Sequence, residues 1–169
     1  TGSVQALVQA LAVSRGSAGL HLSVSHDDYT ANLGGVQLCL QREGAKAEAL
    51  GLDHLHVYPA KAWPIVRTAE EPAPLGVVWN GRAVGTYTLS TILEALKGRT
   101  GRSLAIHSLL GHAPGEVVAI ARALGLSRGV FWVHDFASLC AGYHLLRNDV
   151  ADCGAPPPTS AACGVCLYG

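Results

Sequence analysis

Histidine and aspartate side chains cluster at the ends of three apolar stretches of this sequence. His134 and Asp135 directly follow the stretch FWV, and a neutral imidazole at such a place can donate or accept a hydrogen bond near physiological pH. The other members of the set are His26, Asp27, His107 and His112. A sugar hydroxyl is a suitable partner for these groups. For any single His-Asp pair the alternative is a loop cap that bonds only to backbone, but the repetition favours a site.

Two adjacent glycines, Gly34 and Gly35, stand between a predicted strand and a predicted helix. Because glycine has no side chain, the backbone here can come close to a ligand, and the free amides of a first helical turn favour an anion. A diphosphate would suit this chemistry. The full G-x-G-x-x-G fingerprint is absent, so an ordinary turn is the alternative.

Four of the five cysteines crowd the last thirty residues. They are Cys140, Cys153, Cys163 and Cys166. The last two have C-x-x-C spacing, and four thiolates are enough to close a tetrahedral structural zinc site, which would leave no open position for catalysis. One or two disulfides, or free thiols, are the alternatives. Cys39 lies in a predicted helix, where a small buried hydrophobic residue is the ordinary interpretation.

The elements that must position these groups alternate between strand and helix. Alternating apolar residues predict strands at 20–24 and 54–58, with a helix that opens at Gly34-Gly35 between them. Asn80-Gly81 predicts a hairpin over 75–86. The remaining expected elements are a helix at 4–13, a helix with a Thr91/Glu94 capping box that ends near Gly98, strands at 103–108 and 129–133, and a helix from Pro114 to Gly125.

This rhythm predicts an α/β fold, a Rossmann-like parallel sheet sandwiched by helices with a β-hairpin insertion. A chain of 169 residues supports one core, so we expect a single domain over 1–169. Residues 136–169 should form an irregular, Cys-rich tail within it. Trp132 is expected in the core, while Trp63 and Trp79 are open candidates for stacking on a sugar. Ligands of such sheets bind at the carboxyl ends of the strands, so the polar groups should gather at one edge.

The charge balance argues against polyanion binding. Twelve basic side chains offset twelve acidic ones, so no field of one sign draws the chain to nucleic acid or to an anionic membrane. No apolar run approaches the roughly 20 residues of a transmembrane helix, and the start lacks a signal-peptide pattern. We therefore expect a soluble, cytoplasmic protein without a transmembrane segment.

Residues 131–169, FWVHDFASLCAGYHLLRNDVADCGAPPPTSAACGVCLYG, resemble a segment of the bacterial retaining GT-B glycosyltransferases of family four and their relatives. Many members show an apolar strand, His-Asp-aromatic, a cysteine, a Leu-Leu-Arg-Asn-Asp run, and a Cys-Gly and C-x-x-C tail. Gly34-Gly35-Val36-Gln37 also looks like the family's Gly-Gly-x-x element. In the middle of the chain, only the alternation of strands and helices matches the family.

The resemblance implies the amino-terminal, acceptor-side half of such an enzyme. A second Rossmann domain outside this sequence, with an E-x7-E-type motif, would bind the nucleoside diphosphate, so this chain alone should be inactive. Gly34 and Gly35 would approach the diphosphate, His134 would contact the transferred sugar, and Asp135 would orient that loop. His26, Asp27, His107 and His112 are the acceptor-side candidates.

The implied reaction transfers a sugar from a nucleotide sugar to a hydroxyl of a carbohydrate or lipid-linked acceptor, without a catalytic metal. Cell-envelope or extracellular polysaccharide would be the product, and the enzyme would be cytoplasmic or peripheral to the inner membrane. The main alternative is a non-catalytic Rossmann-like binding or scaffold module with a structural zinc tail. A thiol redox protein built on Cys163 and Cys166 is less favoured, because such motifs usually open a helix near the first β-α-β unit.

Overall fold

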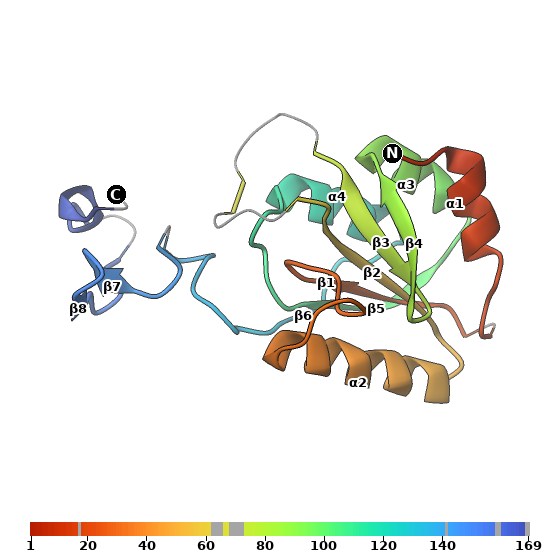
Figure 1. The fold of residues 1–169 in the computed structure, drawn as a ribbon, viewed down its shortest axis with the longest axis horizontal. Helices are drawn as coiled ribbons and strands as arrows, with labels where there is room; N and C mark the ends of the chain where they lie inside the picture. Colours follow the sequence, from red (N-terminus) through yellow and green to blue (C-terminus); the bar gives the residue numbers. More distant parts are fainter. Residues whose placement is uncertain (17, 62–65, 68–72, 141, 158–159, 168–169) are drawn as a thin grey trace.

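The computed structural model describes residues 1–16, 18–61, 66–67, 73–140, 142–157 and 160–167. Within these residues the main sheet has six strands in the order β4-β3-β2-β1-β5-β6 (Figure 1). Its parallel part consists of β2 (Asp53–Pro59), β1 (Leu20–Val24), β5 (Gly101–Ile106) and β6 (Val130–Phe131). The hairpin of β3 (Leu75–Trp79) and β4 (Arg82–Tyr87) is antiparallel and extends the sheet beside β2. The predicted α/β, Rossmann-like sheet is confirmed.

Helices cover both faces of this sheet (Figure 1). One face carries α1 (Val4–Leu11), α3 (Leu89–Ala95) and α4 (Pro114–Ala123), and the other carries α2 (Gly35–Ala49). The larger apolar core lies on the three-helix face, where helix residues pack against every second residue of β1 and β2. Its central members are Leu7, Leu11, Leu22, Val24, Leu55, Val57, Ile92, Val117 and Ile120. No described helix has both the length and the apolar character needed to cross a membrane.

The opposite face of the central strands is polar, because side chains alternate between the two faces of a strand. The strand register places His54, His21 and Ser103 side by side across β2, β1 and β5. Two residues further on, His56 lies beside Ser23. Helix α2 therefore covers a layer of histidine and serine.

The Asn80-Gly81 turn confirms the hairpin prediction. Both residues have positive φ, 51° and 82°, as a two-residue hairpin of the type I′ class requires. The Asn80 side chain also accepts a hydrogen bond from the His54 amide at 2.8 Å and donates one to Asp53 Oδ1 at 2.8 Å. The turn thereby fixes the hairpin to the start of β2.

Three local predictions were wrong. Helix α3 is capped by Thr88, whose Oγ1 accepts from the Thr91 amide at 3.2 Å, so Thr91 lies inside the helix and is not its cap. The strand expected over 129–133 is only Val130–Phe131, because at this edge of the described sheet it pairs only with β5, which ends at Ile106. Trp132 is accordingly 50% exposed, whereas Trp79 belongs to the core. Trp63 lies outside the described residues.

The Cys-rich tail contains more regular structure than expected. Strands β7 (Leu146–Arg147) and β8 (Ala151–Asp152) pair as a small antiparallel hairpin, and the 3-10 helix η1 spans Cys163–Val165 (Figure 1, blue). Local turns at 148–149 and 163–166 allow the hairpin and the 3-10 helix to form, although the segment is rich in proline. Most of its apolar side chains remain exposed.

Candidate functional site

Two predicted site histidines meet at the carboxyl edge of the sheet. His107 follows β5 directly, and His134 lies three residues beyond β6. Because these strands are adjacent and parallel, the two rings come together: His107 Nδ1 lies 2.9 Å from His134 Nε2, and the ring planes differ by 13°. His107 is buried while His134 is exposed, so the pair connects the interior of the domain to its surface.

Glu43, on α2, lies between His107 and a third histidine, His21. Its Oε1 lies 3.0 Å from His107 Nε2 and its Oε2 lies 3.2 Å from His21 Nε2. The His107 contact is outside hydrogen-bond geometry and acts as a charge contact. Burial opposes ionisation of Glu43, but the contacts with the two imidazoles prevail and lower its pKa to about 2. Glu43 is therefore a carboxylate at neutral pH.

This carboxylate sets the direction of the hydrogen bonds that lead to the surface. The negative charge of Glu43, 3.0 Å from His107 Nε2, favours the tautomer that carries its proton on Nε2, so His107 presents the lone pair of Nδ1 to His134. His134 then donates from Nε2, which leaves its own Nδ1 as an acceptor. Burial and the neighbouring His107 hold the pKa of His134 below its ordinary value, which keeps this acceptor neutral. A hydroxyl group is a matching ligand.

Asp135 holds the loop that carries His134. Its Oδ2 accepts a hydrogen bond from Ser108 Oγ at 2.8 Å, and its Oδ1 accepts one from the Ala137 amide at 2.9 Å. The loops after β5 and β6 are thereby joined. This geometry suits an orienting residue.

The loop after β1 is tied to the start of α2. Both carboxylate oxygens of Asp27 accept from Gln37 Nε2 at 2.8 Å. Gly34 is the N-cap of α2 and has no side-chain cap, and a Cβ there would lie 2.4 Å from Gln37 Oε1. A Cβ at Gly35 would meet nothing within 4 Å. The first turn of α2 thus opens outward at Gly35.

His26 and His112 lie near the same loop but differ in burial. His26 Nε2 is 3.8 Å from Asp27 Oδ1 and is partly exposed. His112 is fully buried and donates from Nε2 to the Ser25 carbonyl at 2.8 Å, while its Nδ1 has no partner among the described residues. Burial lowers the pKa of His112 to about 4, although the Ser25 carbonyl opposes this. His112 therefore links the loop after β5 to the end of β1 through a buried hydrogen bond.

Sequence reasoning missed the polar layer beneath α2. His56 donates from Nε2 to the Asp27 carbonyl at 3.0 Å, so its Nδ1 accepts from Ser23 Oγ at 3.2 Å. Ser23 Oγ in turn accepts from His54 Nε2 at 2.7 Å. Burial lowers the pKa of His54 to about 3 and that of His56 to about 4. The signal was present in the strands HLS and HLHVY, where polar residues occupy every second position.

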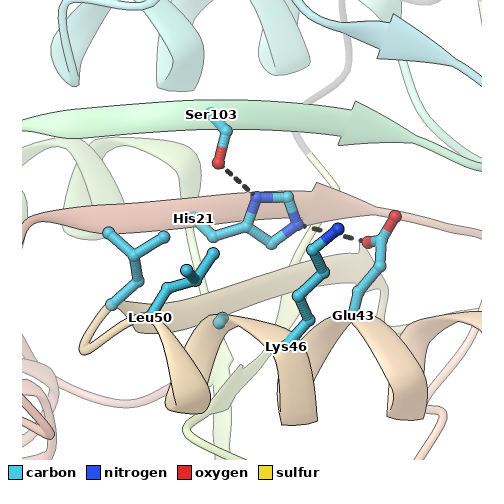
Figure 2. A pocket seen from close by; sticks show the side chains of 7 residues that line it. His21, Glu43, Lys46, Leu50 and Ser103 are labelled. Carbon is cyan, nitrogen blue, oxygen red and sulfur yellow. Dashed lines mark hydrogen bonds and ion pairs between the residues drawn. The ribbon is translucent and has the colours of Figure 1, made fainter.

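A pocket of about 220 Å³ opens beside His21 (Figure 2). His21 comes from β1 and accepts at Nδ1 from Ser103 Oγ at 2.7 Å, while Glu43 and Lys46 reach it from α2. The apolar part of its lining consists of Ala47, Leu50 and Leu52. His21 and Ser103 lie early in β1 and β5, so this pocket is near the amino ends of the strands. Both ring nitrogens of His21 already have partners.

The four tail cysteines line a second, smaller pocket of about 110 Å³. In the part of the chain that the structure describes, no group of three or more His, Cys, Asp or Glu is arranged as a ready metal site. Metal binding by these cysteines therefore stays a prediction. Cys39 is only half-buried in α2.

The carboxyl edge thus combines an exposed imidazole acceptor, a carboxylate that orients it through a second imidazole, and a helix start open at a glycine. These groups can hold a hydroxyl-bearing ligand and an anion. No protein-family model, no curated protein and no solved structure matches the chain.

Proposed function

We propose that this chain is the acceptor-side half of a GT-B type glycosyltransferase, which transfers a sugar from a nucleotide sugar to a hydroxyl acceptor. The observation that carries the proposal is the Glu43–His107–His134 arrangement at the carboxyl edge, the edge at which open α/β sheets bind ligands. The resemblance of residues 34–37 and 131–169 to family-four enzymes supports the same reaction.

The reaction joins the acceptor oxygen to the anomeric carbon of the sugar and breaks the bond to the diphosphate. Negative charge develops on the departing diphosphate, and one of its oxygens takes up the acceptor proton. The amino-terminal end of α2 at Gly35 would stabilise that charge, as helix starts do for anions. His134 would accept a hydrogen bond from a sugar hydroxyl, and its bond to His107 would hold it in that orientation.

Gly35→Ala is expected to separate binding from stability. Alanine at this position meets no atom within 4 Å and should leave the free energy of unfolding unchanged or raise it by up to about 1 kcal/mol. The added methyl would occupy the space proposed for the diphosphate and raise the KM for the donor about tenfold. Urea unfolding and donor-dependent kinetics measure the two effects. A lower stability with unchanged KM would show that Gly35 serves only the turn.

Glu43→Gln tests the positioning role of the carboxylate. Loss of its charge removes the orientation of His107 and should lower kcat about tenfold, less than the roughly 10²–10⁴-fold of a direct proton-transfer group, because Glu43 acts only through His107. Glu43 also supports the protonated form of His134, so the acid limb of the pH–rate profile should move to lower pH. Ser103→Ala is the matched control, because it removes the hydrogen bond to Nδ1 of His21 and keeps the Glu43 carboxylate. If the acid limb of the pH–rate profile of Glu43→Gln stays at the wild-type pH, this role is contradicted.

The proposed function is tested by nucleoside diphosphate release. The full natural chain that contains these residues is incubated with a panel of uridine, guanosine and thymidine diphosphate sugars, with and without a mixture of lipid-linked and oligosaccharide acceptors. We expect release from one donor class, stimulated by acceptor. Neither release nor binding of any donor would overturn the proposal and favour a non-catalytic scaffold module.

A further inference from the structure

The four cysteines of the tail come from three segments and face one pocket. Cys140 lies in the loop after β6, Cys153 directly follows β8, and Cys163 and Cys166 stand at the two ends of η1. All four line the same 110 Å³ pocket. The η1 turn, closed by a hydrogen bond from the Cys166 amide to the Cys163 carbonyl at 2.9 Å, brings the last two cysteines to the same side.

The tail has too little apolar packing to hold this arrangement by itself. Val150, Val165 and Leu167 are 84%, 63% and 72% exposed. With so much apolar surface exposed, a cross-link through the cysteines would stabilise this arrangement.

Backbone strain indicates the same need. Of the six non-glycine residues with positive φ in the described chain, five lie between residues 143 and 155. Asn148 and Asp149 make the hairpin turn at little cost, but positive φ is strained at Tyr143, Leu145 and Ala155. Such conformations persist only where the surroundings impose them, and the Cys153 amide bonds the Leu145 carbonyl at 3.0 Å. The strained positions thus lie next to the cysteines.

We propose that Cys140, Cys153, Cys163 and Cys166 bind one structural zinc ion. Four thiolates satisfy the closed tetrahedral coordination that Zn²⁺ prefers, and each thiol that binds releases its proton. Arg147 also lines the pocket and offsets part of the negative charge of a four-thiolate site. Because the thiols are not assembled as a ready site, binding would draw them together and couple metal affinity to folding of the tail. This site is independent of the proposed sugar transfer.

Zinc content tests the inference without reference to activity. Protein purified under reducing conditions without added metal is expected to contain about one zinc per chain. Cys163→Ser should lose most of this zinc, while Cys39→Ser, which removes a thiol from α2, should keep it. Equal zinc content in the two variants, or a wild-type protein without zinc that does not take up added Zn²⁺, would overturn the proposal.

Cobalt binding keeps the test valid if Cys163→Ser does not fold. Wild-type protein is stripped of metal under reducing conditions and titrated with Co²⁺. We expect saturation near one equivalent, with thiolate-to-metal charge-transfer bands and the visible bands of tetrahedral Co²⁺, and displacement by Zn²⁺. Disulfides among these four cysteines that persist under the reducing conditions, or a spectrum of octahedral Co²⁺ alone, would contradict the four-thiolate site.

Discussion

Replacing His134 by alanine is expected to lower the rate of the proposed sugar transfer about a hundredfold while the protein stays folded. The expected size follows from the loss of one preorganised hydrogen-bonding group at a reacting centre. His134 is exposed, so its removal leaves no cavity, but Nδ1 of the buried His107 loses its donor, and the free energy of unfolding should fall by about 1–3 kcal/mol. Nucleoside diphosphate release under saturating donor and acceptor measures the effect.

Lys97→Ala is the matched control for this substitution. Lys97 is an exposed residue between α3 and the amino end of β5, where it pairs with Glu94 at 2.6 Å, so it lies away from the carboxyl edge. Its replacement should leave the rate within about twofold. A rate for His134→Ala equal to that of Lys97→Ala would exclude His134 from the reaction.

Acidification is expected to unfold the domain below about pH 5.5. The folded state holds His54, His56 and His112 neutral, with pKa values of about 3, 4 and 4, whereas the unfolded chain protonates histidine below about pH 6.5. The unfolded state therefore binds more protons between these values. Stability is fully present above pH 6.5 and is lost as the pH falls toward 4, by up to about 1.4 kcal/mol per pH unit for each histidine.

Urea unfolding at pH 7.5, 6.5 and 5.5 measures this loss. Three such groups can remove about 4 kcal/mol per pH unit, a large share of the 5–15 kcal/mol typical of a folded domain. Glu43 does not contribute in this range, because its pKa of about 2 keeps it ionised. His112→Gln can still donate to the Ser25 carbonyl and should flatten the slope. A free energy of unfolding that is constant from pH 7.5 to 5.5 would refute the neutral histidine layer.

The alternation of strands and helices was predictable from the sequence because it depends on local patterns. Asn80-Gly81 predicted the hairpin, and Pro114 begins α4 as expected. The meeting of His107 and His134 followed from a general rule about the carboxyl ends of parallel strands. Predicting these features requires only the order of the strands and helices along the chain.

The partners within the site depend on register and on helix rotation, which local patterns do not specify. Glu43 is one of several charged residues on α2, and only the docking of this helix on the sheet places it between His21 and His107. Similarly, the pairing of His21 with His54 results from the register of β1 and β2. The edge position of β6 also could not be read from its apolar composition, which is typical of a central strand.

Hydrogen–deuterium exchange of the full natural protein, with and without a pooled set of nucleotide sugars, tests the location of the site most directly. We expect slower exchange of the amides at the start of α2, around Gly35, and in the loops that carry His107 and His134. Protection confined to other parts of the chain, or no protection at the carboxyl edge at saturating ligand, would contradict a ligand site at this edge.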